Sequence, residues 1–215
     1  YYRDEELEQL IEKTHRAGFQ ISVHTCGTRA TEQALNIYQK VLHNFPGSDH
    51  RHRIEHFEMP LGDQIQRAVD LKLGLAMQPM FLYLSGSETF ENIRSLLGSE
   101  RVSRWKPFRT ILDAGGLVAG GSDAPVTKMN PLQGVQACIL HPNKSERITL
   151  YEALKLFTIN GARIGFEEDL KGSIEPGKMA DFAVLSDNPY SVQPEEVGDI
   201  KVEMTIVGGD IVYQA

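Results

Sequence analysis

Three residues of this sequence combine a metal-binding side chain with a position at the end of an apolar run. His24 closes the run that starts at Phe19, His56 closes the run Arg53-Ile-Glu-His56, and Asp123 follows the run that starts at Leu117. Imidazole and carboxylate groups are ligands that suit zinc and similar divalent ions. The two histidines and the aspartate are therefore a candidate set of metal ligands.

The same three residues also have ordinary structural roles, which the sequence leaves open. A single histidine at a strand end is a satisfied core residue about half of the time. Asp123 stands directly before Ala124-Pro125, where an aspartate commonly forms a turn.

The other histidines are expected to be surface residues. His50 and His52 have the HxH spacing that can bind a metal, but they alternate with Arg51 and Arg53 ahead of a strand, so we expect an exposed segment there. We expect the same exposure for His15, His43 and His141.

The segments that must position the candidate ligands alternate between strands and helices. Apolar residues at helical spacing predict helices over about 4–17, 30–44, 61–73, 103–114 and 130–140. Short apolar runs predict strands over about 19–24, 53–57, 75–80 and 117–119, and we expect a long loop with a short helix over 81–102. This alternation predicts an α/β fold with a parallel sheet, whose active-site residues gather at the carboxyl ends of the strands.

The pattern changes after residue 148. Thr149-Leu-Tyr-Glu152 is a capping-box sequence and predicts the start of a helix. Residues 172–186 and 200–207 are β-rich, and Gly208-Gly209-Asp210 predicts a hairpin turn. We therefore place a domain boundary near 165–172, between a larger α/β domain, 1–168, and a small antiparallel β unit, 169–215.

The composition argues against some kinds of partner. The 215 residues carry a formal net charge of -7, which does not favour nucleic acid or an anionic membrane surface. No apolar run approaches the roughly 20 residues of a membrane helix. Two cysteines are too few for a disulfide framework, so we expect a reduced, cytoplasmic setting. Because the sequence begins at Tyr1, we expect it to be a fragment of a longer chain.

Four motifs resemble those of a known family. Val23-His24-Thr-Cys-Gly27, Arg53-Ile-Glu-His56, Gly121-Ser-Asp123-Ala-Pro125 and Gly172-Ser-Ile-Glu-Pro-Gly-Lys-Met-Ala-Asp181 occur in this order. They are similar to motifs in the second half of metal-dependent amidohydrolases, in particular amidohydrolase family 3. The resemblance covers nearly the whole chain, and the last motif is especially specific.

The resemblance implies both a fold and a chemistry. It implies the C-terminal half of a (β/α)8 TIM barrel, strands five to eight, followed by part of the composite β-sandwich domain of amidohydrolases. His24 would end the fifth strand, His56 the sixth and Asp123 the eighth. These residues would bind a divalent metal, with zinc as the first expectation. Asp123 would also move a proton during hydrolysis of a non-peptide carbon–nitrogen bond in a small amide, cyclic amide or N-acyl compound.

The chain also departs from the family pattern. An acidic residue is frequent where this sequence has Thr28, and the first four barrel strands with their metal ligands have no counterpart. Half a barrel exposes two parallel edges, so we expect a homo-oligomer or association with a companion N-terminal half. Two hypotheses stay open: the chain supplies half of a hydrolase site, or it is a catalytically silent fragment or regulatory relative that serves as a binding or structural module. In the second case the metal could be absent.

Overall fold

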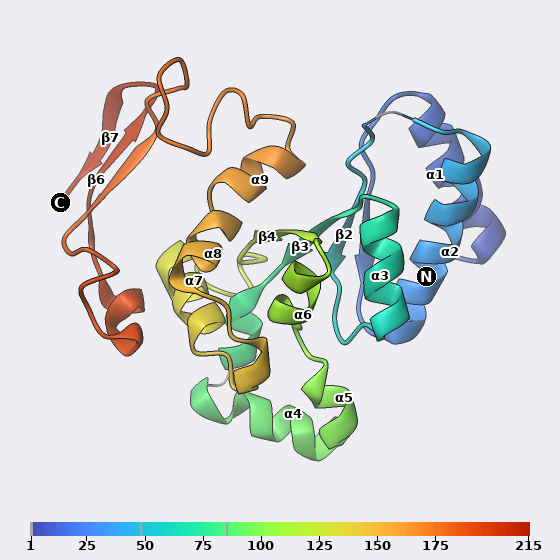
Figure 1. Ribbon diagram of the computed structural model, residues 1–215, viewed down its shortest axis with the longest axis horizontal. Coiled ribbons are helices and arrows are strands. Elements are labelled where there is room, and N and C mark those ends of the chain that lie inside the picture. The colour runs from blue at the N-terminus through green and yellow to red at the C-terminus, as the bar shows by residue number, and fades with distance from the viewer. Residues whose placement is uncertain (1, 48, 85) are drawn as a thin grey trace. The chain divides into compact units, whose positions relative to one another are not determined.

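The protein has an α/β fold, as the sequence predicts (Figure 1). The computed structural model describes residues 2–47, 49–84 and 86–215. The chain forms two compact units: unit 1 is Tyr1–Met77 with Glu91–Val118, and unit 2 is Gln78–Phe90 with Ala119–Ala215. The separate division into an α/β domain over 1–168 and a β unit over 169–215 stays a prediction.

Parallel strands form the centre of unit 1. β1 (Ser22–Thr25), β2 (Arg53–His56) and β3 (Gly74–Met77) are parallel neighbours, and β4 (Leu117–Gly120), which begins in this unit, follows β3 in the strand order. The register pairs Thr25 with His56. The carboxyl ends of β1 and β2 therefore lie side by side.

Helices alternate with these strands along the chain, and most of them bury apolar side chains. The helices of unit 1 are α1 (Asp4–Arg16), α2 (Thr28–Asn44), α3 (Gly62–Asp70), α5 (Ser99–Ser103) and α6 (Phe108–Asp113), and α4 (Thr89–Leu97) runs into this unit from unit 2. α2 packs on α1, α3 and β1 (Figure 1). Its buried face has the helical spacing of Ala34, Leu35, Ile37, Tyr38 and Val41. Burying each large apolar side chain stabilises the fold by about 1.5–3 kcal/mol.

Unit 2 contains the last α-helices, α7 (Pro131–Ile139), α8 (Leu150–Leu156) and α9 (Ile159–Ile164). The predicted capping box is confirmed at the start of α8. The backbone N–H of Glu152 donates to the Thr149 hydroxyl at 3.2 Å, and the Thr149 N–H donates to the Glu152 carboxylate at 2.8 Å. Short 3-10 helices complete the unit: η1 (Pro79–Tyr83), η2 (Gly86–Glu88), η3 (Lys144–Glu146) and η4 (Pro194–Asp199).

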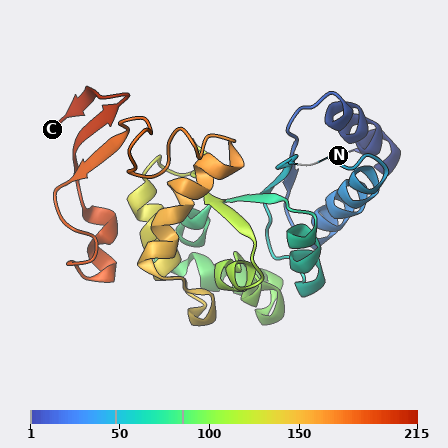
Figure 2. The ribbon, with the colours of Figure 1, turned by 45° about the horizontal axis from the view of Figure 1, so that its top comes forward.

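A three-stranded antiparallel sheet ends the chain. β5 (Phe182–Leu185), β6 (Val202–Val207) and β7 (Asp210–Gln214) pair in this order and are drawn in orange to red in Figure 2. The predicted hairpin is confirmed. Gly208 and Gly209 connect β6 to β7 with φ angles of 60° and 93°, which glycine adopts without a steric penalty.

Two predicted segments differ from the structure. Residues 81–102, expected to be a long loop with a short helix, are largely helical. The helix predicted over 103–114 starts only at Phe108, because a residue that precedes proline, here Lys106 before Pro107, is disfavoured in the α conformation.

The expectation that His52 and His141 are surface residues is wrong. Their exposed fractions are 1% and 0%. The His52 ring lies beside His15, from α1, at 5.1 Å between ring centroids, and beside Tyr38, from α2, at 5.7 Å. Partners that are distant in sequence therefore allow this histidine to be buried.

Among the described residues, no helix is both long and apolar enough to cross a membrane. Both cysteines are free thiols, with Cys26 exposed and Cys138 buried.

Candidate metal centre

His24 and His56 come together at the carboxyl ends of β1 and β2. Their ring centroids lie 4.2 Å apart, and the ring planes cross at 69°. His24 is exposed, whereas His56 is only 5% exposed. Two imidazoles this close can supply two nitrogen ligands at one place. The structure thus brings together two of the three predicted ligands, and their binding of a metal stays a prediction.

The backbone at His56 has an unusual conformation for a residue with a side chain. Its φ is 71°, and the N–H of Phe57 donates to the carbonyl oxygen of Glu55 at 3.0 Å, which closes a γ-turn centred on His56. A γ-turn with positive φ is rare and strained. Such a conformation costs about 1–3 kcal/mol and persists only where surrounding contacts hold it.

Cys26 lies close to the histidine pair. Its Sγ is 3.3 Å from Nε2 of His24. Nevertheless, over residues 2–47, 49–84 and 86–215 no group of three or more His, Cys, Asp or Glu side chains is placed to hold a metal ion. The structure therefore shows a histidine pair, which would need further ligands to form a complete site.

Asp123 belongs to unit 2 and sits in a tight turn after β4. Its φ is 53°, a left-handed conformation that aspartate tolerates better than most residues. The N–H of Val126 donates to the Asp123 carbonyl oxygen at 2.8 Å, and the Thr127 hydroxyl donates to the carbonyl oxygen of Ser122. The Asp123 side chain is exposed. Its convergence with the two histidines stays a prediction.

A cavity of about 230 Å³ in unit 2 adjoins the end of β4. Its walls include Met80, Gly121, Ser122, Lys128, Met129 and Phe157. The ring of Phe157 fits here because Gly120 and Gly134 have no Cβ, which would overlap the ring at either position. The cavity is mostly apolar and has one cationic side chain at its wall.

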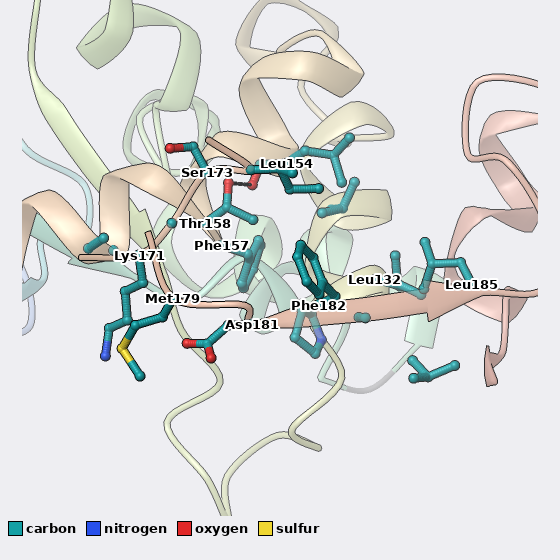
Figure 3. A pocket seen from close by; sticks show the side chains of 18 of the residues that line it. Leu132, Leu154, Phe157, Thr158, Lys171, Ser173, Met179, Asp181, Phe182 and Leu185 are labelled. Atoms are coloured by element: carbon teal, nitrogen blue, oxygen red, sulfur yellow. Dashed lines mark hydrogen bonds between the residues drawn. The ribbon is translucent and has the colours of Figure 1, made fainter. Parts of the chain in front are cut away.

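A larger cavity of about 660 Å³ in unit 2 shares Asn130, Pro131 and Phe157 with the smaller one (Figure 3). Figure 3 shows Phe157, Phe182 and Leu132 around it, with the Asp181 carboxylate nearby. None of the three predicted ligands lines either cavity. The wall of the smaller cavity includes Ser122, which directly precedes Asp123, whereas the larger cavity has no wall residue next to a predicted ligand in the sequence.

Sequence reasoning missed a buried charged cluster beside His56. Glu58, Trp105 and Lys106 are 8%, 5% and 0% exposed. Glu58 follows His56 by two residues, and Pro107 could have indicated that Lys106 is not helical. Nothing in the local sequence pairs residue 58 with residues 105 and 106.

Comparisons with known proteins agree with the resemblance. A profile described as "Amidohydrolase family" matches residues 1–213. The putative amidohydrolase YtcJ of Bacillus subtilis is 33% identical over 222 residues, which cover 98% of this chain and 40% of that protein. The N-substituted formamide deformylase of Arthrobacter pascens is 28% identical over 221 residues, or 100% of this chain and 40% of that protein.

A solved structure is similar as well. An uncharacterized metal-dependent hydrolase from Pyrococcus horikoshii OT3 matches with a TM-score of 0.77 and 25% identity, over 90% of this chain and 39% of that one. The chain spans about two fifths of the length of these relatives. From the match along nearly its whole length, the chain belongs to the amidohydrolase family.

Proposed function

We propose that the protein is a metal-dependent hydrolase of non-peptide carbon–nitrogen bonds, acting on a small amide, cyclic amide or N-acyl compound. The observation that carries this proposal is the His24–His56 pair, whose rings lie 4.2 Å apart at the ends of neighbouring parallel strands. Strand carboxyl ends are where α/β enzymes place their reacting groups. The similarity to a formamide deformylase supports an N-acyl substrate.

Each predicted residue has a role in this proposal. His24 and His56 would hold the ion through neutral imidazole nitrogens, and Asp123 would be a third ligand. When bound, a divalent metal, with zinc as the first choice, polarises a carbonyl and lowers the pKa of a bound water toward neutrality. Asp123 would accept a proton from the attacking water and deliver it to the leaving nitrogen. The 230 Å³ cavity offers apolar walls for a substrate group next to the strand that precedes Asp123.

We also propose that β1 to β4 correspond to strands five to eight of a TIM barrel. The two outer strands of such a half-barrel would leave parallel edges free, so a second copy or a companion chain would cover them. The molar mass from light scattering tests this. A monodisperse monomer with protected edge-strand amides would contradict the proposed association.

Zinc binding to the purified chain tests the proposed function. We expect the wild-type chain to bind Zn²⁺, and His24→Ala and His56→Ala to lose most of the affinity. His43→Ala is the matched control, because His43 is an exposed histidine on α2. The amine released from an N-substituted formamide then reports hydrolysis, which we expect Asp123→Asn to abolish. A wild-type chain that binds no zinc, or binds it as well without His56, contradicts the proposal.

A further inference from the structure

The chain leaves β2 through a run of left-handed residues. His56, Phe57 and Met59 have φ angles of 71°, 49° and 47°. Phe57 and Met59 do not belong to Gly, Asn, Asp and His, the residues that adopt this conformation most readily. Contacts from elsewhere in the fold must therefore hold residues 56–59 in place.

Glu58 is the side chain through which this turn is held. The Lys106 Nζ lies 2.6 Å from Glu58 Oε1, and the Lys106 side chain is 0% exposed. The Trp105 indole N–H donates to the other carboxylate oxygen, Oε2. Both carboxylate oxygens are thus engaged by two consecutive residues in a buried place, where charge-assisted hydrogen bonds are strong.

The next residue is held as well. The carbonyl oxygen of Met59 accepts a hydrogen bond from the Thr28 hydroxyl at 3.1 Å and one from the Arg104 guanidinium at 3.1 Å. Thr28 is the first residue of α2 and follows His24 by four positions. The turn is therefore held by contacts from two separate segments, residues 104–106 and the first residue of α2.

The conformation of this turn decides where the His56 ring lies. In the strand register His24 stands opposite Glu55, and Thr25 stands opposite His56. Regular alternation would therefore point the His24 and His56 side chains to opposite faces of the sheet. A φ of 71° rotates the Cα–Cβ bond of His56 away from the direction that a strand gives it, and the two rings meet at 4.2 Å.

We propose that Glu58, held by Trp105 and Lys106, is the positioning residue that fixes His56 beside His24. Its value for metal binding rests on the proposed function, in which His56 is a ligand. The placement of the His56 ring beside His24 does not rest on the proposed function. Glu58 touches neither substrate nor metal in this proposal and acts only through the backbone of residues 56–59.

The test combines two measurements on the 215-residue chain. The first is the NOE between the ring protons of His24 and His56 in the metal-free protein. The second is the dissociation constant for Zn²⁺, measured by competition with a chelator. In Glu58→Ala we expect the NOE to disappear and the Zn²⁺ affinity to fall about 10- to 100-fold, as is typical when a group that orients a ligand is removed.

Two further variants make the test decisive. Glu58→Ala leaves Lys106 buried without its carboxylate, which can unfold the protein. Trp105→Phe removes the hydrogen bond to Oε2 and part of a buried ring system but keeps an aromatic side chain and the Glu58–Lys106 pair, so we expect a folded protein with a smaller change in the same direction. Glu100→Ala is the control, because it removes a carboxylate that is 94% exposed and near Arg104, and we expect wild-type values.

The outcomes separate this inference from the proposed function. An NOE that persists unchanged in folded Glu58→Ala, or in Trp105→Phe if Glu58→Ala does not fold, overturns the positioning role. If the wild-type chain binds no zinc and the NOE disappears in these variants, the positioning role is supported and the proposed function is contradicted. Far-UV circular dichroism establishes which variants are folded.

Discussion

Acidification from pH 7.5 to pH 5 is expected to destabilise the fold through one buried histidine, His52. The backbone N–H of Ile21 lies 3.1 Å from His52 Nδ1, and His15 Nδ1 lies 2.9 Å from His52 Nε2. A backbone N–H can only donate, so Nδ1 of His52 accepts and its Nε2 carries the proton. Protonating Nδ1 would place two N–H groups against each other, and the His52 ring is therefore held neutral.

The neighbours of His52 also help to keep its ring neutral. His15 Nε2 lies 2.7 Å from the carbonyl oxygen of Phe45 and donates to it, and the N–H of His52 donates to His50 Nδ1 at 2.9 Å. Burial, followed by the proximity of His50 and His15, lowers the pKa of His52 to about 4. Burial also lowers the pKa of His50, while the nearby Asp49 acts in the opposite direction.

The sign and size of the effect follow from these pKa values. An unfolded histidine has a pKa of about 6.5, so the unfolded chain binds more protons than the folded chain below that pH. Stability is therefore unaffected above about pH 6.5 and falls as the pH drops toward the folded-state value of about 4. At about 1.4 kcal/mol per pKa unit the full loss is about 3 kcal/mol, and the loss at pH 5 is about 2 kcal/mol.

The assay is urea unfolding at pH 7.5 and pH 5.0, followed by the fluorescence of Trp105, the single tryptophan. His52→Asn keeps an acceptor for the Ile21 N–H and has no group that titrates in this range. We expect the wild-type free energy of unfolding to fall by about 2 kcal/mol more than that of His52→Asn. His43→Asn, which changes an exposed histidine, should keep the wild-type pH dependence. Equal pH dependence in the wild type and His52→Asn would refute the reasoning.

Two further changes test packing and capping in unit 2. Gly134→Ala should destabilise the fold by about 1–3 kcal/mol in urea unfolding, because its Cβ would overlap the Phe157 ring. Gly161→Ala is the control, because its Cβ would meet only the carbonyl oxygen of Leu156, at 4.0 Å; it should be neutral or stabilise the fold by up to about 1 kcal/mol. Equal losses of stability in Gly134→Ala and Gly161→Ala would contradict the packing argument. Thr149→Ala should lower the free energy of unfolding by about 1 kcal/mol while Thr149→Ser retains it; an unchanged midpoint for Thr149→Ala would show that the capping box contributes nothing.

The sequence by itself determined the parallel α/β class, most of the helices and the capping box at Thr149. It also determined the Gly208-Gly209 hairpin and the family. These features follow from short-range patterns, such as the apolar spacing of α2 or the two glycines between apolar strands. A local pattern is enough because each helix or strand is chosen by residues that are close in sequence.

Only the tertiary structure decided which charged and polar residues are buried and where their partners lie. Lys106 can be buried because it forms an ion pair with Glu58. His52 can be buried because Ile21 and His15 supply its hydrogen bonds. The left-handed turn at His56, which brings its ring beside His24, is likewise invisible in the run Arg53-Ile-Glu-His56. A buried polar group is tolerable only with a matched partner, and such partners come from distant parts of the chain that folding alone brings together.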